Sequence, residues 1–313
     1  GDGSLSGTNE FRGEWAQHVA ELAAEGVISA ETAAAHPALI IVGLVGSIDN
    51  DMVGTDMTIG ADTALHRILD AIDQLTSTAA SHQRTFVVEV MGRHCGYLPL
   101  MAAVAGGADY VFTPEDPAGP GWQDELAEHL RLGREAGRRE SIVLVAEGAH
   151  DRDGNELSTQ LIADTIQERT GEDARVTILG HVQRGGTPSA YDRWMSTLLG
   201  YAAVQEILAS SAEDEPVILG VRRNRITRIL LMKAVHDTRA VKDLIAAGDY
   251  AAAQASRGSS FSSMVGINQI LSTPPQLTPE PTGEIKRVAI LHAGGLAPGM
   301  NTAARVAVRL GIA

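Results

Sequence analysis

One short segment combines residue types that could remove a proton close to a metal ion. Residues 43–51 (GLVGSIDND) place Ser47, Asp49 and Asp51 at alternating positions behind the apolar run 38–42. That run predicts a buried strand, so the three side chains would lie at a strand end, where open parallel sheets bind ligands. Two carboxylates there suit proton abstraction beside a metal–phosphate complex. Taken alone, Asp-Asn-Asp equally well caps a helix or forms a turn.

A glycine-rich segment at the start of the chain could bind phosphate. In Gly1-Asp2-Gly3-Ser4, the two glycines would let backbone amides approach an anion. Asp2 could bind Mg²⁺, and Ser4 could donate a hydrogen bond to the anion. The same four residues also fit an ordinary turn, and similar phosphate-binding turns occur in NAD kinases and lipid kinases.

Cationic residues follow other predicted strands. In MGRHCG (91–96), Arg93 comes after the strand expected at 85–90, and Gly92 leaves room for a ligand. In GHVQRGG (180–186), His181 and Arg184 are three residues apart and could converge on one phosphate. A surface arginine, or a core histidine beside one, is the alternative for each cluster.

Glu147 follows the strand expected at 141–146 and could accept hydrogen bonds from sugar hydroxyls. A helix-capping or solvated glutamate is the alternative.

Taken together, "GDGS", "GSIDND", "MGRHCGY", "VAEGA" and "RVTILGHVQRGGTPSAYDR" resemble the ATP-dependent phosphofructokinase family, in its order and approximate spacing. The resemblance covers essentially the whole chain and points to the two-half form produced by duplication and fusion. It implies phosphoryl transfer from MgATP to the 1-hydroxyl of fructose 6-phosphate, giving fructose 1,6-bisphosphate and ADP, the committed step of glycolysis.

The resemblance also assigns roles to residues. It implies that Asp49 is the catalytic base and that Asp2 and Asp51 serve Mg²⁺. The ATP segment would be Gly1, Asp2, Gly3 and Ser4. The substrate-binding residues would be Ser47, Ile48, Asp49, Arg84, Met91, Gly92, Arg93, Glu147, Arg175, His181, Val182, Gln183 and Arg184.

Within that set, Arg84 and Arg175 would reach into the site of a partner subunit, so the resemblance implies a homo-oligomer with shared sugar-phosphate sites. Glycine at both Gly3 and Gly46 implies ATP, because pyrophosphate-using members carry Asp and Lys at those places. Ser47 replaces the threonine of many bacterial relatives and keeps the hydroxyl.

Members of the family carry a glycine-rich strand, turn and helix ahead of GDGS, so this chain is expected to be truncated and inactive alone. Residues 1–271 would be the amino-terminal catalytic half, 272–284 a proline-rich linker, and 285–313 the start of a regulatory second half. In the latter, Leu296 stands where the catalytic-type motif has Asp. Two alternatives are a noncatalytic effector-binding half and a different glycine–aspartate kinase acting on NAD or a lipid.

The elements that must position these residues alternate along the chain. Strands are expected at 38–45, 85–90, 110–113, 141–146, 176–179, 217–221 and 287–292. Helices are expected at 10–26, 62–81, 97–106, 122–138, 158–170, 190–209 and 233–246, and a further helix is expected after the turn at 294–301. Such alternation predicts an α/β fold, with a largely parallel sheet and helices on both faces.

Composition limits the function classes. A 313-residue chain with 44% hydrophobic residues can bury a real core, and its net charge of −14 argues against nucleic acid as a partner. The single cysteine, Cys95, excludes an intramolecular disulfide and suits a buried thiol in a cytoplasmic protein. No apolar run reaches membrane-spanning length, so no membrane association is expected.

Overall fold

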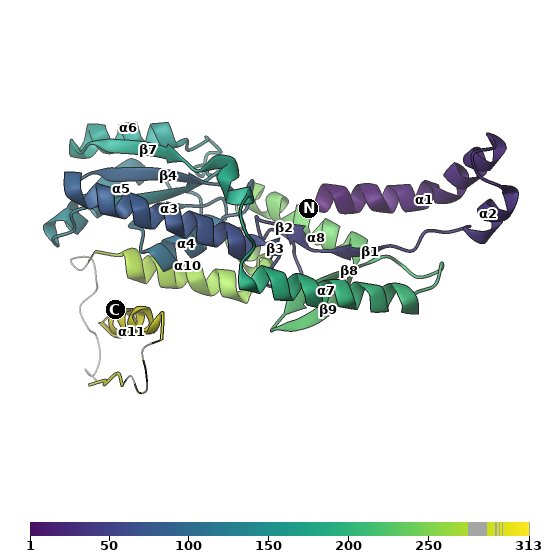
Figure 1. Ribbon diagram of the computed structural model, residues 1–313. Helices are drawn as coiled ribbons and strands as arrows, with labels where there is room; N and C mark the ends of the chain where they lie inside the picture. The colour runs from purple at the N-terminus through teal and green to yellow at the C-terminus, as the bar shows by residue number, and fades with distance from the viewer. Residues whose placement is uncertain (275–286, 292, 294, 296, 313) are drawn as a thin grey trace. The chain divides into compact units, whose positions relative to one another are not determined.

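The structure is a computed structural model that describes residues 1–274, 287–291, 293, 295 and 297–312 (Figure 1). The chain forms two compact units, each assembled from separate stretches of sequence. The first unit comprises Gly1–Arg67, Met91–Leu98 and His181–Phe261, and the second comprises Ile68–Val90, Pro99–Gly180 and Ser262–Ala313.

A four-stranded parallel sheet forms the centre of the second unit. Its strand order is β5-β6-β4-β7. The strands are β4 (Thr85–Val90), β5 (Tyr110–Phe112), β6 (Ser141–Ala146) and β7 (Ala174–Ile178). All six residues of β6 are buried, as expected for a parallel strand covered on both faces.

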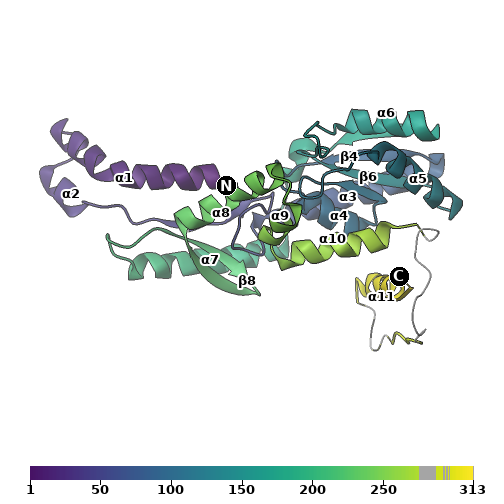
Figure 2. The ribbon, with the colours of Figure 1, turned by 180° about the vertical axis from the view of Figure 1, so that it is seen from behind.

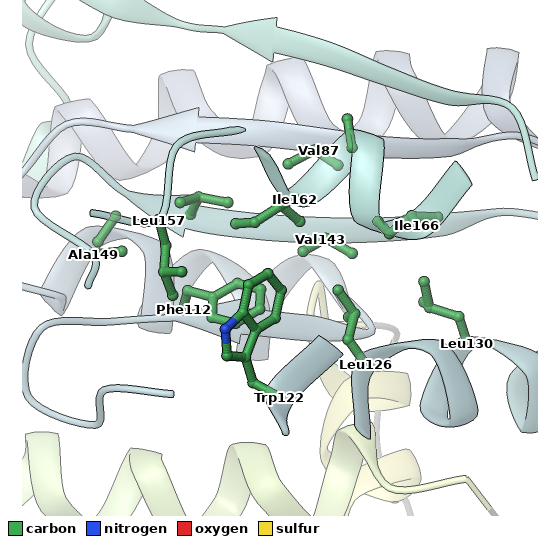
Figure 3. Packing of buried hydrophobic residues seen from close by; sticks show 13 residues of the cluster. Val87, Phe112, Trp122, Leu126, Leu130, Val143, Ala149, Leu157, Ile162 and Ile166 are labelled. Carbon is green, nitrogen blue, oxygen red and sulfur yellow. The ribbon is translucent and has the colours of Figure 1, made fainter. Parts of the chain in front are cut away.

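One face of this sheet packs against two helices, α5 (Trp122–Glu135) and α6 (Thr159–Thr170). Figure 3 shows Trp122 and Leu126 of α5 beside Ile162 and Ile166 of α6, with Val143 of the sheet in the same cluster. Ser158 caps α6, because its hydroxyl accepts a hydrogen bond from the Leu161 amide. The regular apolar period of these elements therefore produces an apolar core.

Parts of three further helices belong to the second unit and lie along its sheet in both ribbon views (Figures 1 and 2). They are α3 (Ala61–His82), α4 (Tyr97–Gly106) and α10 (Ser259–Ser272), each shared with the first unit. Gly106 of α4 lies so close to α3 that an added Cβ would be 3.2 Å from Ile72. The predicted helices on both faces of a parallel sheet are thus confirmed here.

The first unit contains a sheet with the order β1-β8-β9 and a short parallel pair, β2-β3. The strands are β1 (Val42–Leu44), β2 (Gly46–Ser47), β3 (Ile59–Gly60), β8 (Val217–Arg222) and β9 (Arg225–Leu230). β1 runs parallel to β8, whereas β8 and β9 are antiparallel. β9 was not predicted from the sequence. In the structure, Arg223 and Asn224 form the turn between β8 and β9, and both adopt positive φ, as a two-residue hairpin turn requires.

The first unit contains five complete α-helices in the described residues, and the first of them begins in the GDGS segment, for which a turn was predicted. They are α1 (Asp2–Ala24), α2 (Ala30–Ala35), α7 (Ala190–Ala209), α8 (Leu231–Ala246) and α9 (Tyr250–Ser256), with the 3₁₀-helix η1 (Gly180–Arg184) starting at the unit boundary. None of the helices in the described part of the chain is both long and apolar enough to span a bilayer.

The most regular predictions agree with the structure to the residue, and the errors have physical causes. The first strand, predicted at 38–45, is limited to Val42–Leu44, because only these residues face partners in β8. Residues 287–291 form no strand. Residue 292, Leu296 and residues 275–284 of the linker predicted at 272–284 lie outside the described residues. Farther on, the helix predicted after 294–301 is present as α11 (Met300–Ile312).

Candidate functional site

The predicted acidic segment forms a compact loop in the first unit, immediately after β2. The Ser47 hydroxyl donates to Asp51 Oδ1 at 3.0 Å and accepts a hydrogen bond from the Asp49 amide at 3.2 Å. Asp49 is only 6% exposed. The segment does not continue as a strand with alternating side chains, because Asn50 adopts a left-handed conformation with φ 51°.

A side chain further along the chain holds this loop in place. Thr58 donates through its hydroxyl to the Ser47 carbonyl at 2.5 Å, and its amide donates to Asn50 Oδ1 at 2.7 Å. Thr58 is fully buried. These bonds join Ser47 and Asn50, on either side of Asp49, to one buried residue, which favours a single conformation of the loop.

The GDGS segment is the start of a helix and not a turn, which corrects the prediction. Gly1 is the N-cap of α1, and Asp2 to Ser4 form its first turn. The segment can still meet an anion, because the first amides of a helix have no partner within the helix. Arg239 of α8 donates to Asp2 Oδ2 at 3.0 Å, and this hydrogen bond lowers the pKa of Asp2.

The MGRHCG segment forms a tight backbone turn that exposes Arg93. The Cys95 amide donates to the Gly92 carbonyl at 2.8 Å. Gly92 has φ 156°, and an added Cβ would meet the Cys95 carbonyl at 2.3 Å, so glycine is required there. Arg93 itself is left-handed, with φ 52°. The sulfur of Cys95 is buried, which confirms the prediction of a buried thiol.

Carboxylates and cations from separate stretches of sequence line a single hollow of about 210 Å³ in the first unit. The predicted members are Asp2, Asp51 and Arg93, and Arg93 Nη1 lies 3.9 Å from Asp2 Oδ1. The other lining residues are His94, Thr238, Arg239, Lys242 and Arg257. This cavity, called the acid–base cavity below, combines metal-binding and anion-binding groups.

Sequence reasoning missed three cations of the acid–base cavity. Arg239 and Lys242 belong to α8, and Arg257 is the C-cap of α9. Nothing near them in the sequence resembles a motif, because they lie on ordinary amphipathic or short helices. Their spacing of three residues, which places Arg239 and Lys242 on one helix face, was the only available signal.

His181 and Arg184 occupy the same face of η1, since side chains three residues apart eclipse in a 3₁₀-helix. Both are exposed, so they are accessible to a ligand. Between them, Gln183 is 1% exposed, and its Oε1 accepts a hydrogen bond from the Met91 amide at 3.2 Å. Gln183 therefore joins the GHVQRGG segment to the start of the MGRHCG segment.

The remaining predicted residues, Arg84, Glu147 and Arg175, belong to the second unit. Arg84 Nε and Arg175 Nη2 both donate to Asp173 Oδ2, at 2.8 and 2.9 Å. One carboxylate thus gathers two guanidinium groups whose side chains remain 33% and 55% exposed. Glu147 follows β6 and is exposed. The pKa of Glu89 is raised mainly by the burial of Glu89 and, to a smaller extent, by the negative charge of Glu147.

The carboxylates of the acid–base cavity suit Mg²⁺ that arrives with phosphate. Within the described residues, no group of three or more His, Cys, Asp or Glu side chains could hold a metal ion. Asp2 and Asp51 nevertheless line the same cavity. Mg²⁺ is usually bound by one or two carboxylates together with substrate phosphates, and this donor set fits that pattern.

The chain thus combines an α/β fold with one cavity that carboxylates and cations share, and these are the groups that a phosphate and its metal ion require. The family described as phosphofructokinase matches residues 1–207, and the chain belongs to that family.

Relatives and solved structures extend the match beyond that region. The chain is 48% identical over 312 residues to the human ATP-dependent 6-phosphofructokinase of liver type, covering 100% of this chain and 40% of the relative. It is 46% identical over 311 residues to the ATP-dependent 6-phosphofructokinase of Aspergillus fumigatus, covering 98% of this chain and 38% of that protein.

The phosphofructokinase structure from Saccharomyces cerevisiae matches with a TM-score of 0.83 and 47% identity, covering 86% of this chain and 36% of that one. A pyrophosphate-dependent phosphofructokinase from Marinobacter aquaeolei shares the fold, with a TM-score of 0.55 and 20% identity over 70% of this chain and 56% of that one. The chain therefore spans about 40% of the length of the curated relatives it matches.

Proposed function

We propose that the full-length protein transfers a phosphoryl group from MgATP to the 1-hydroxyl of fructose 6-phosphate. The observation that carries this proposal is the acid–base cavity, where Asp2, Asp51 and Arg93 meet. Family membership supports it, and the relatives at 45–48% identity are named ATP-dependent 6-phosphofructokinases.

Asp49 is proposed to accept the proton of the attacking hydroxyl. The burial of Asp49 and the hydrogen bond from its amide to the Ser47 hydroxyl support this role, because they restrict the conformation of the loop. A cationic complex nearby favours the ionised carboxylate, which is the form that accepts a proton at neutral pH. Most of the remaining catalysis in such reactions comes from alignment and charge neutralisation.

Asp2 and Asp51 are proposed to hold Mg²⁺, which would neutralise charge on the nucleotide phosphates. The first turn of α1, with Gly1, Gly3 and Ser4, would present backbone amides to those phosphates. Because Arg239 already bonds to Asp2, the carboxylate is oriented within the cavity without the ion.

The sugar phosphate is proposed to bind to Arg93, His181 and Arg184, with Met91, Gly92, Val182 and Gln183 shaping the backbone around it. Ser47 and Ile48 would contact the reacting end of the sugar, and Glu147 its hydroxyls. Arg84 and Arg175 would complete the phosphate site of a partner subunit in a homo-oligomer. Their exposure and shared carboxylate, Asp173, support a role outside their own unit's core.

ATP is the proposed phosphoryl donor. Among the described residues, an added Cβ at Gly3 or Gly46 would meet no atom within 4 Å beyond its own neighbours in the chain. The fold itself therefore does not demand glycine at either position, and the open space is available to a nucleotide. This observation agrees with the names of the relatives, which specify ATP.

The experiment is an assay of the purified full-length protein with Mg²⁺. ATP or pyrophosphate is the donor, and fructose 6-phosphate, NAD or diacylglycerol is the acceptor. We expect ADP release that depends on fructose 6-phosphate, with ATP but not pyrophosphate as donor. Release with NAD or diacylglycerol as acceptor, or no acceptor-dependent release at all, would contradict the proposal. An effector-binding half without catalysis would bind fructose 6-phosphate, detected as a raised melting temperature, yet show no turnover.

A further inference from the structure

We propose that Arg257 is a positioning residue, which fixes the loop that carries Asp49 relative to the loop that carries Arg93. The inference rests on the function proposed above, because it concerns the geometry of that reaction. None of the sequence motifs includes Arg257, which follows α9 far from both loops in the sequence.

The guanidinium group of Arg257 bonds to both loops at once. Its Nη1 donates to the Asp51 carbonyl at 2.9 Å, and its Nη2 donates to the His94 carbonyl at 2.7 Å. A guanidinium is planar and holds its nitrogens at fixed spacing. The two carbonyls, and with them the two loops, are therefore held at a defined separation.

Each acceptor belongs to the residue that directly follows one with left-handed backbone. Asn50, with φ 51°, precedes Asp51, and Arg93, with φ 52°, precedes His94. Asparagine adopts left-handed backbone fairly readily, whereas at an arginine such backbone persists only where the surroundings enforce it. Arg257 constrains both loops, two residues after Asp49 in the first and one residue after Arg93 in the second.

Arg257 is itself well anchored. It is the C-cap of α9, and its amide donates to the Gln254 carbonyl at 3.1 Å. The next residue, Gly258, has φ 109° and separates α9 from α10. α9 also packs against α8, beside which it lies in Figure 2, and α8 contributes Arg239 to the same cavity. The guanidinium thus extends from a helix end and not from a flexible loop.

Arg257 also lines the acid–base cavity, so a direct contact with phosphate is the competing role. The two roles respond differently to lysine. A contact that depends on charge is restored by Arg257→Lys, because lysine keeps the charge. A bridge between two carbonyls is restored only in part, because one ammonium nitrogen replaces two guanidinium nitrogens.

The experiment compares Arg257→Ala and Arg257→Lys with the wild-type full-length protein, measuring kcat and KM for both substrates. We expect kcat to fall by about 10- to 100-fold in the alanine variant, since small misplacement of reacting groups has effects of that order. Both KM values should change much less than kcat. We also expect lysine to recover only part of kcat, and added guanidinium ion at non-denaturing concentration to raise kcat of the alanine variant.

Arg12 offers a matched control in the same unit. Its Nε donates to the Leu39 carbonyl at 3.2 Å and its Nη2 to the Asp214 carbonyl at 2.9 Å, so it also bridges two segments through carbonyl groups. None of these residues lines the acid–base cavity. Arg12→Ala should leave kcat unchanged even if it lowers the melting temperature.

A second readout needs no activity. Hydrogen exchange should become faster at residues 47–56 and 91–98 in Arg257→Ala, and not in Arg12→Ala. Unchanged exchange in both loops together with wild-type kcat overturns the inference, as does full recovery of kcat by lysine. If wild-type protein shows no sugar-dependent turnover, the proposed function fails, and the exchange measurement still decides the role of Arg257. Should the alanine variant fail to fold, Arg257→Lys decides in the same assays.

Discussion

The two units build their structure in different ways. The second unit is a parallel sheet whose strands β4 and β6 pair residue for residue, with helices packed on an apolar core. The first unit has short strands joined by loops, and it contains four of the five left-handed residues other than glycine found in the described chain: Asn50, Arg93, Arg223 and Asn224. Polar bonds from residues such as Thr58 and Arg257 hold its loops.

This difference predicts a separation of effects. Regular packing supplies stability through many small contacts, so one lost side chain changes the free energy of unfolding. Strained loops place single groups, so one lost side chain there changes chemistry with little effect on stability. The following substitutions test that separation, beginning with the largest expected effect.

Asp49→Asn should reduce kcat of the full-length protein by about 10²- to 10⁴-fold, the usual contribution of a general base. The amide has nearly the same shape as the carboxylate but cannot accept the proton. Melting temperature should change little, because the loop is held by Ser47 and Thr58. Steady-state kinetics check this against Asp73→Asn, an exposed carboxylate of α3. Turnover within a few-fold of wild type would rule out Asp49 as the base.

Leu126→Ala should act on the other side of the comparison. Leu126 is fully buried in the core of the second unit, and removing its side chain leaves a cavity (Figure 3). We expect destabilisation of about 2–5 kcal/mol, seen as a lower denaturation midpoint, with unchanged KM in the protein that remains folded. Leu161→Ala on α6, where the side chain is 44% exposed, is the control. Equal effects from both substitutions would mean that burial does not determine stability in this unit.

The regular unit was also the easier one to predict from sequence. In the second unit, β4 and β6 were predicted to the residue, as was α4, most of which belongs to it, because apolar period and flanking polar residues define such elements locally. In the first unit, only α7 was predicted to the residue. The short strands of the first unit were not, since β1 consists only of the three residues that pair with the first half of β8. That pairing depends on residues more than a hundred positions away, which no local pattern contains.

The site shows the same division. The sequence motifs identified Asp2, Asp51 and Arg93, and the fold brings these three residues to one cavity. Arg239, Lys242 and Arg257 were missed, because helix and cap positions acquire a function only through tertiary structure. The GDGS segment was assigned to a turn because its two glycines outweighed its acidic first turn, which is favourable at a helix start.

Arg175→Ala tests whether the regular unit contributes to binding. The bond from Arg175 to Asp173 is exposed, and such pairs contribute little to stability. Loss of one cation from a phosphate site should instead raise KM for fructose 6-phosphate by about tenfold, with KM for ATP nearly constant. Arg131→Ala, which removes exposed pairs with Glu128 and Glu135 on α5, is the control. A rise of both KM values to the same extent would argue against a sugar-specific role.

The smallest expected effect concerns pH and the stability of the second unit. His129 of α5 contacts Tyr110 edge to face, and burial lowers its pKa below the ordinary value of 6.5, with Arg138 adding to the shift. In the unfolded chain His129 takes up a proton as pH falls through 6.5, whereas the folded protein does so only at lower pH. Stability is therefore complete above pH 6.5 and decreases below it, by about 1 kcal/mol per unit of separation between the two pKa values.

Thermal unfolding at pH 7.5 and 5.5 measures this loss. His129→Gln should reduce the difference in melting temperature between the two pH values, because the residue that takes up the proton on unfolding is gone. His82→Gln, at the exposed end of α3 in the same unit, should leave the difference as it is in the wild type. If the glutamine at 129 leaves it unchanged as well, the acid sensitivity originates elsewhere. If instead kcat and not stability follows His129, the separation between a structural unit and a chemical unit breaks down at this residue.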